Sequence, residues 1–206
     1  MKNTVLALLL AFSSGVAFGQ EAEPSILLIT GKTVEGTVVN EDSLFIHYVF
    51  EKRSGKRVEK KLDWERVFSF VDAEGNERVI YVPDSTLGNY FTEEEMRYYI
   101  KGEQDALSGY KSNWTIWVGV PVSGGLGYVL SSSPLVFTVP FFYMIGAALP
   151  KYKMTPSSIS DASLLRQPAY ILGYERTART KRLFKSLASG MVGAAVGVLI
   201  GQLTKP

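Results

Sequence analysis

The sequence predicts an α+β membrane protein, in which a small antiparallel β-barrel or bent sheet is followed by juxtamembrane helices and about three transmembrane helices. Three observations lead to this fold class. Short runs of β-branched and aromatic residues alternate with turn residues over residues 24–84. Residues 112–150 contain no charged side chain, and residues 186–204 form a second uncharged run that is rich in glycine. Uncharged runs of about 20 residues are long enough to cross a bilayer as helices.

The composition of the 206-residue chain excludes several functional classes. Hydrophobic residues make up 46% of the chain and charged residues 20%, which argues against wholesale disorder. Because the chain has no cysteine, disulfides, thiolate metal sites and a cysteine nucleophile are excluded. His47 is the single histidine, so a multi-histidine metal site is excluded as well.

The formal net charge of +2 hides a strong segregation of charge along the chain. Residues 21–111 carry 18 acidic and 12 basic side chains, a net charge of −6. Residues 151–185 carry eight basic and two acidic side chains, a net charge of +6. The eight basic residues are Lys151, Lys153, Arg166, Arg176, Arg179, Lys181, Arg182 and Lys185.

Residues 1–19 are typical of a secretory signal peptide. Lys2 gives a basic start and residues 5–12 an apolar core. Ala17 and Gly19 are small residues at the −3 and −1 positions of a cleavage site. An uncleaved anchor is the alternative, and both interpretations place the rest of the chain outside the cytoplasm.

Residues 24–84 are expected to form a small β domain of five or six strands. Turn residues such as Ser54-Gly55-Lys56 separate the apolar runs about every ten positions, which is typical of a strongly bent antiparallel sheet or barrel. The expected strands are residues 26–30, 34–39, 44–50, 57–62, 67–71 and 78–82.

The start of this domain resembles uncharacterised exported bacterial membrane proteins. The resemblance rests on a strand, a Gly31-Lys32 turn and the motif Val34-x-Gly36-x-Val38-Val39. In those proteins the motif opens a small SH3-like or Sm-like β domain, and glycine-rich transmembrane helices follow it. The resemblance implies an architecture and not an activity, because small barrels host many unrelated functions.

Residues 92–112 are expected to form a juxtamembrane helix that continues directly into the first membrane segment. Thr92 and Glu95 have the spacing of a capping box, in which each residue binds the other's backbone N–H. Residues 113–150 then predict a transmembrane hairpin, with crossings at residues 114–130 and 135–149.

Residues 151–185 are expected to form a basic loop and juxtamembrane helix, and residues 186–203 a glycine-rich transmembrane helix. Small residues on one helix face predict a close helix–helix contact, within the chain or between copies. The helix-packing candidates are Gly190, Gly193, Gly197 and Gly201. The cations of the preceding segment are candidates for a lipid or partner contact, with an ordinary basic flank as the alternative. These cations are Arg176, Arg179, Lys181, Arg182 and Lys185.

The sequence contains a weak internal echo at an offset of 71 residues. The motif Tyr99-Ile100-x-Gly102 recurs as Tyr170-Ile171-x-Gly173. At the same offset, Lys111 corresponds to Arg182 and Gly119 to Gly190. The echo indicates two related helical segments, with chance similarity as the alternative.

The charge pattern conflicts with the simplest membrane topology. A signal peptide followed by a membrane hairpin returns residues 151–185 to the outside, whereas short basic loops prefer the cytoplasm. Three explanations stay open. Residues 112–150 cross only once, the protein lies in an outer membrane, or the basic segment binds anionic head groups from the outside.

The sequence contains no phosphate-binding loop, nucleophile elbow or zinc-protease motif. Asp63 and Glu65 on either side of Trp64 are the best glycan-site candidates, with a strand-end turn as the alternative. Glu103 and Asp105 are two residues apart on the expected helix and face different sides of it. His47 is most simply a sheet residue.

The expected function is that of a non-enzymatic cell-envelope membrane protein, a scaffold or accessory subunit that presents a small exterior β domain. No cofactor and no metal are expected. The alternatives are a pore-like homo-oligomer formed by glycine-rich helices and a membrane enzyme that uses carboxylates or His47. The expected partners are membrane lipid and other envelope proteins or further copies of the chain, not nucleic acid. The expected location is a bacterial envelope membrane, the inner membrane before the outer, with the β domain on the non-cytoplasmic side.

Overall fold

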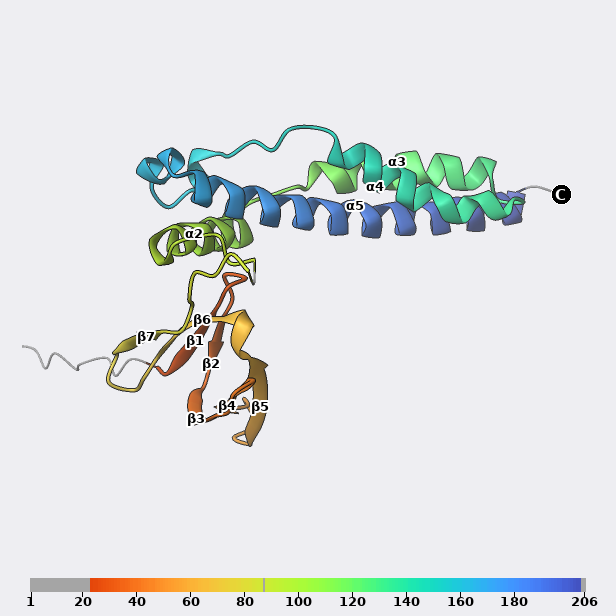
Figure 1. The fold of residues 1–206 in the computed structure, drawn as a ribbon. Coiled ribbons are helices and arrows are strands. Elements are labelled where there is room, and N and C mark those ends of the chain that lie inside the picture. The colour runs from red at the N-terminus through yellow and green to blue at the C-terminus, as the bar shows by residue number, and fades with distance from the viewer. Residues whose placement is uncertain (1–22, 87, 205–206) are drawn as a thin grey trace, which may run out of the picture. The chain divides into compact units, whose positions relative to one another are not determined.

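The computed structural model describes residues 23–86 and 88–204, which fall into two units (Figure 1). The first unit comprises residues 23–27 and 33–80 and is built of β-strands. The second comprises residues 28–32 and 81–204 and is mainly helical. The predicted signal peptide lies outside the described residues. An α+β architecture is therefore confirmed, and each unit is considered by itself.

The β unit consists of two antiparallel sheets. The four-stranded sheet has the order β2-β1-β6-β7, and the three-stranded sheet the order β3-β4-β5. The strands are β1 (Ser25–Leu28), β2 (Thr33–Glu35), β3 (Thr37–Glu41), β4 (Phe45–Glu51), β5 (Arg57–Asp63), β6 (Val67–Val71) and β7 (Glu77–Val79). All six predicted apolar runs thus contain strand residues.

The predicted strand over residues 34–39 is divided at Gly36. This residue has φ +150°, and a Cβ atom there would lie 2.9 Å from the Tyr48 side chain. The chain therefore needs glycine where it passes from β2 in one sheet to β3 in the other. A register shift between Val38 and Asn40 adds a further irregularity.

The described strands do not close into a barrel, which corrects one of the two predicted forms of this domain. Pairing is continuous only within each sheet, because the break at Gly36 separates β2 from β3. Within this unit the side chains of Ile26, Ile46, Val67 and Phe68 are almost completely buried. They come from both sheets, so apolar packing joins what strand pairing does not.

The helical unit is organised along one long helix, α5 (Pro168–Thr204), as Figure 1 shows. Helix α2 (Glu93–Gly109) lies along the first half of α5, and α3 (Trp114–Val129) and α4 (Val139–Ala148) lie along its second half. Short 3-10 helices η2 (Pro134–Thr138), η3 (Pro156–Ser158) and η4 (Ala162–Arg166) occupy the connections. A fourth, η1 (Trp64–Arg66), belongs to the β unit.

The capping box at the start of α2 is confirmed. The Glu95 backbone N–H donates to the Thr92 hydroxyl, and the Thr92 N–H donates to the Glu95 carboxylate at 2.8 Å. Helix α2 does not run on into α3, because the chain turns extended at Tyr110. The predicted continuous helix is therefore wrong at residues 110–113.

Among the described residues, only one helix is long and apolar enough to cross a membrane. This finding corrects the prediction of about three transmembrane helices. Helix α5 has 37 residues, about 55 Å at 1.5 Å per residue. Helix α3 has 16 residues, and the second arm of the predicted hairpin is divided into η2 and α4. Pro140 in the first turn of α4 has no N–H to donate to a preceding carbonyl, which favours a break between these two helices.

Substitution of Thr92 tests whether the capping box stabilises the start of α2. Thr92→Ala removes the side-chain acceptor at the helix start and should lower the free energy of unfolding by about 1 kcal/mol. Thermal unfolding followed by circular dichroism should show a Tm lower by roughly 2–4 °C.

The matched control is Thr180→Ala. Thr180 is exposed inside α5, and its hydroxyl donates only to the Arg176 carbonyl of the preceding turn. Alanine favours a helix interior, so this variant should keep or slightly raise the Tm. Equal losses in both variants would contradict the assigned role of Thr92.

Candidate functional site

Helices α2 and α5 cross in close contact at two glycines. A Cβ atom on Gly102 would collide with the carbonyl oxygen of Tyr170, and a Cβ atom on Gly173 would collide with the carbonyl oxygen of Tyr99. The two contacts are reciprocal, as in a two-fold symmetric interface. The crossing therefore joins the two copies of the echoed Tyr-Ile-x-Gly motif directly.

The chain from α2 to α3 runs parallel to α5 along its whole length. Tyr110 lies beside Lys181, Val120 beside Gly193, and Ser131 beside Gly201. These pairs are separated by 70 to 73 residues, so the register matches the 71-residue offset of the sequence echo. The echo thus corresponds to positions that lie side by side in space.

The four predicted packing glycines contact α3, α4 and the turn after α3. A Cβ atom added to Gly190 would lie 3.0 Å from the Cα atom of Pro140 in α4. A Cβ atom added to Gly193 would meet the Val120 carbonyl oxygen of α3. Gly197 meets the Gly124 carbonyl, and Gly201 meets Ser131. All four contacts are within the chain, and backbone carbonyls face most of them.

Small and hydroxyl side chains fill the interior of this bundle, whereas large apolar side chains face outward. Thr115, Ser123 and Ser186 are fully buried, and the Ser189 hydroxyl donates to the Thr115 carbonyl at 3.1 Å. Trp117 is 80% exposed. Other large exposed side chains are Val122, Leu126, Phe137, Phe141, Phe142, Ile145, Leu149, Val192, Val196, Leu199, Ile200 and Leu203. This distribution is the reverse of a water-soluble core.

Asp105 of α2 anchors three segments of the helical unit. Its Oδ2 atom accepts hydrogen bonds from the Ser160 N–H at 2.8 Å, the Ser160 hydroxyl at 2.7 Å and the Tyr170 hydroxyl at 2.8 Å. Lys101 lies 3.4 Å from Oδ1. Burial acts to raise the pKa of Asp105, but the hydrogen bonds outweigh it, so the pKa lies below the ordinary value. The buried carboxylate is therefore fully satisfied.

Glu103 lies on the neighbouring face of α2 and, unlike Asp105, is a buried carboxyl group that is not fully hydrogen-bonded. It is 4% exposed, and its Oε2 atom is buried without a hydrogen-bond partner among the described residues. Burial raises the pKa of this carboxyl group, although Arg176, Tyr99 and Thr177 act against the rise. Glu103 and Asp105 have separate partners, as their spacing predicted.

Most predicted contact cations bind groups of the same chain. The Arg176 guanidinium donates to the Tyr99 hydroxyl at 2.7 Å. The Lys181 ammonium donates to the carbonyls of Ala106, Leu107 and Tyr110, where α2 ends, and Lys185 donates to the Asn113 side chain at 3.2 Å. Lys181 thus binds carbonyls at the end of α2, of which that of Ala106 also accepts the Tyr110 N–H. Arg179 is exposed.

Arg182 is the most buried of these cations, with 3% of its surface exposed. Its guanidinium donates to the Tyr110 hydroxyl at 2.9 Å and to the carbonyls of Pro150 and Lys151. The Tyr152 ring centroid lies 4.1 Å from the guanidinium carbon, within the range of a cation–π contact. Arg182 therefore joins α5 to the end of α2 and to the chain after α4.

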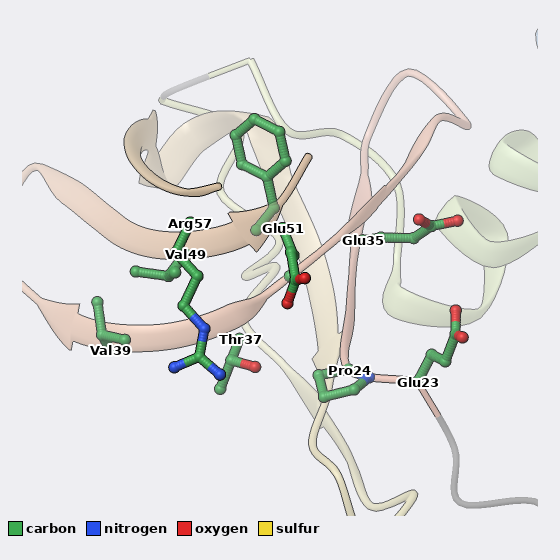
Figure 2. Close-up of a pocket in the computed structure, with 10 residues that line it drawn as sticks. Glu23, Pro24, Glu35, Thr37, Val39, Val49, Glu51 and Arg57 are labelled. Atoms are coloured by element: carbon green, nitrogen blue, oxygen red, sulfur yellow. The ribbon is translucent and has the colours of Figure 1, made fainter. Parts of the chain in front are cut away.

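The β unit contains an open groove of about 840 Å³ between its two sheets (Figure 2). Glu51 and Arg57 are register partners on β4 and β5 and line one part of it, and Glu23 and Glu35 line another. Pro24, Gly36, Thr37, Val39, Val49 and Phe50 complete the lining. The lining thus combines three carboxylates, one guanidinium and apolar walls.

The remaining sequence candidates occupy ordinary positions of the β unit. The His47 Nδ1 atom lies 2.9 Å from the Glu59 carboxylate on the neighbouring strand, and Asp63 lies 3.9 Å from Arg66. No group of three His, Asp or Glu residues in the described part of the chain could hold a metal ion. Neither His47 nor Asp63 belongs to the lining of the groove.

Sequence reasoning missed the joints at Asp105 and Arg182. Asp105 was judged only by its spacing from Glu103, and Arg182 only as one of five candidates for a lipid or partner contact. The available signal was the echo, which aligns Lys111 with Arg182 and both Tyr-Ile-x-Gly motifs. It did not reveal partners such as Ser160 or Pro150, which lie in an irregular loop.

Alanine at the crossing glycines tests the close parallel packing. Gly102→Ala and Gly173→Ala insert a Cβ atom against a backbone carbonyl and should each lower the free energy of unfolding by about 1–3 kcal/mol or more. Thermal unfolding of the detergent-solubilised chain measures the change.

Gly125→Ala and Gly146→Ala are the matched controls. No atom lies within 4 Å of a Cβ at either position, and both residues are helical. These variants should keep the Tm or raise it, because alanine is the better helix former by roughly 0.5–1 kcal/mol. A loss of the same size in the controls would mean that the crossing is not specially tight.

The two buried carboxyl groups should give opposite pH dependences. The lowered pKa of Asp105 means that its contribution is present above the pKa of the unfolded chain and is lost as pH falls through the folded-state value. Asp105→Asn should therefore cost roughly 2–4 kcal/mol at pH 7, and the difference from the wild type should shrink at acidic pH.

Glu103→Gln provides the comparison with the reverse sign. The raised pKa of Glu103 means that the wild type loses stability as pH rises from the unfolded-state pKa through the folded-state pKa. The Gln variant lacks this loss, so its stability relative to the wild type should increase over that range. Unfolding measured between pH 3 and pH 8 in both variants decides the signs, and parallel curves would contradict them.

The helical unit is therefore a parallel helix pair with buried charged joints, and the β unit offers an open mixed groove. No family model, no curated protein and no solved structure matches this chain. Functional conclusions consequently rest on the geometry described above.

Proposed function

We propose that this chain is a non-enzymatic membrane protein, a scaffold or accessory subunit that presents its β unit to partner proteins. In this proposal α5 crosses the membrane, and the shorter helices α3 and α4 are embedded beside it. The segment before the apolar part of α5, together with α2, forms the juxtamembrane part. The β unit supplies the partner surface.

The observation that carries the proposal is the outward-facing apolar surface of α3, α4 and the second half of α5. Only 33% of the most apolar 18-residue window of α5 is buried, so this helix is not the enclosed core of a globular protein. Exposed apolar surface on such a scale is costly in water. In lipid, by contrast, small residues at the helix contacts and large apolar residues outside are the favoured arrangement.

The non-enzymatic part of the proposal rests on how the ionisable groups are used. Asp105 and Arg182 are buried, and both side chains, like that of Lys181, are hydrogen-bonded to other segments of the helical unit. The groove of the β unit has carboxylates but no histidine or other base arranged with a nucleophile. A recognition surface fits this lining better than a catalytic centre.

A pore-like homo-oligomer is the weaker alternative. It was suggested by the glycine stripe of α5, but Gly190, Gly193, Gly197 and Gly201 contact α3, α4 and Ser131 of the same chain. These contacts leave the stripe unavailable for packing between copies. Conductance in reconstituted bilayers would favour this alternative.

The charge pattern of residues 151–185 conflicted with the simplest membrane topology. The parallel packing supports the explanation in which this basic segment lies outside the cytoplasm. Because α2 lies beside the first half of α5, the end of α2 and the basic segment 151–185 are on the same side of the membrane in this proposal. Four of the eight basic residues of that segment bind groups of the chain itself. We propose the non-cytoplasmic face of an envelope membrane for this side and for the β unit.

Single-cysteine labelling tests the membrane arrangement, and the cysteine-free chain needs no prior substitution. Ser108→Cys at the end of α2 and Ser157→Cys in the basic loop should react with an impermeant maleimide from the same side of sealed vesicles. Val196→Cys, on the outward face of α5, should stay unreactive until detergent is added. Reaction of Val196→Cys as fast as Ser157→Cys in intact vesicles would contradict membrane insertion.

Pull-down from mild detergent tests the scaffold role. The full chain should retain a reproducible set of envelope proteins, and Glu35→Lys combined with Glu51→Lys should lose them because both carboxylates line the groove. Glu65→Lys combined with Glu74→Lys makes the same charge change on exposed residues outside the groove and should retain them. Loss in both double variants, or in neither, would contradict the groove as the partner surface.

A further inference from the structure

The cations around the start of the apolar bundle divide into two groups. Arg176, Lys181, Arg182 and Lys185 have partners within the chain. Lys111, Lys151 and Lys153 are exposed, and no acidic partner lies within salt-bridge distance of them among the described residues. The free cations are therefore mostly not those that the sequence singled out.

Exposure alternates along residues 151–154, which have no regular secondary structure. Tyr152 and Met154 pack against the buried cluster of Ala106, Tyr110, Tyr174 and Ala178, while Lys151 and Lys153 are exposed. The two lysines are thus available to the surroundings, whereas the residue after each of them is bound to the helices.

Arg182 places these lysines at the same level as the start of α3. Its guanidinium contacts Tyr110 and the carbonyls of Pro150 and Lys151, and it lies 5.9 Å from the Trp114 ring. Lys185, one turn later, reaches Asn113. Lys111, Lys151 and Lys153 therefore lie close to the level at which the apolar surface begins, and we call these three residues the cationic belt.

The sequence around the belt is poor in acidic residues. Residues 106–160 and 176–204 contain neither Asp nor Glu. Glu103 and Asp105 of α2 are buried and face Arg176 and Lys101, and the exposed Asp161 and Glu175 are not within salt-bridge distance of the belt lysines. The aromatic residues Trp114 and Trp117 are exposed directly after Lys111, as is typical of a membrane–water interface.

We propose that the cationic belt binds the phosphate head groups of anionic phospholipids. The inference rests on the proposed membrane insertion and adds the lipid class to it. The exposed lysines, the scarcity of acidic residues in the adjoining sequence and the adjacent tryptophans match a negatively charged bilayer surface. The belt would then anchor the bundle at a defined depth, from whichever side α2 occupies.

Tryptophan quenching by brominated lipids tests the proposal. A Trp64→Phe background leaves Trp114 and Trp117 as the fluorophores, both next to the belt. The full chain is reconstituted into vesicles of phosphatidylcholine with brominated phosphatidylcholine or with brominated phosphatidylglycerol. Each cation near an anionic surface changes affinity about fivefold before screening. Quenching by the anionic lipid should therefore exceed that by the zwitterionic lipid by about twofold or more.

Lys151→Gln combined with Lys153→Gln should bring this ratio close to 1, and 0.5 M salt should lower it in the unmodified background. Lys56→Gln combined with Arg166→Gln removes the same charge outside the belt and should leave the ratio unchanged. Quenching by brominated phosphatidylcholine in every variant shows that each one is folded and inserted.

The outcomes separate the two proposals. Equal quenching by both lipids, or a ratio that survives the loss of Lys151 and Lys153, overturns the lipid-binding belt while membrane insertion stands. Absence of quenching by either brominated lipid overturns membrane insertion itself. A ratio that falls equally in the control variant would assign the effect to net charge and also overturn the belt.

Discussion

The close parallel contact between the α2–α3 segment and α5 is the constraint on which the helical unit depends. It is possible because glycines stand where backbones meet, as at the reciprocal pair Gly102 and Gly173 and at Gly197. Once the backbones are this close, side chains such as Lys181 and Arg182 reach carbonyls and hydroxyls on the neighbouring segments. Close approach therefore creates the polar joints, and the joints in turn fix the register.

The buried charges of the helical unit differ in how well they are compensated. Asp105 has three donors and a nearby lysine, and Arg182 has a hydroxyl, two carbonyls and an aromatic ring. Glu103 retains a buried oxygen without a partner among the described residues. Removing one partner of a buried polar contact costs far more free energy of unfolding than losing a surface ion pair. The contacts of Asp105 and Arg182 should therefore contribute more to the stability of this region than its surface ion pairs do. Exposed cations such as Lys151 have no acidic partner within the described chain and can bind groups outside it.

Local features were predictable where the physical cause is local. The capping box of Thr92 and Glu95 depends on four residues, and each predicted apolar run contains a strand because its alternation is a property of the run itself. The barrel, which was one of the two forms predicted for the β domain, and the prediction of about three membrane spans were wrong. The first failed at Gly36, where the chain leaves one sheet for another, and the second at Pro140, where the second arm of the hairpin divides. The groove of the β unit was not predicted, because Glu35, Glu51 and Arg57 come together only through the two sheets.

The sequence by itself determined the distribution of charge, the apolar runs, the glycine spacing and the 71-residue echo, because these are patterns along one chain. Only the tertiary structure decided that the echoed segments lie side by side in parallel and that the packing glycines contact α3, α4 and Ser131. It also decided which cations of the basic segment are bound and which are free. A side chain's partner is set by distances between elements, and no pattern along residues 151–185 distinguishes buried Arg182 from exposed Lys153. That difference arises from the few ångströms that separate α5 from Tyr110 and Pro150.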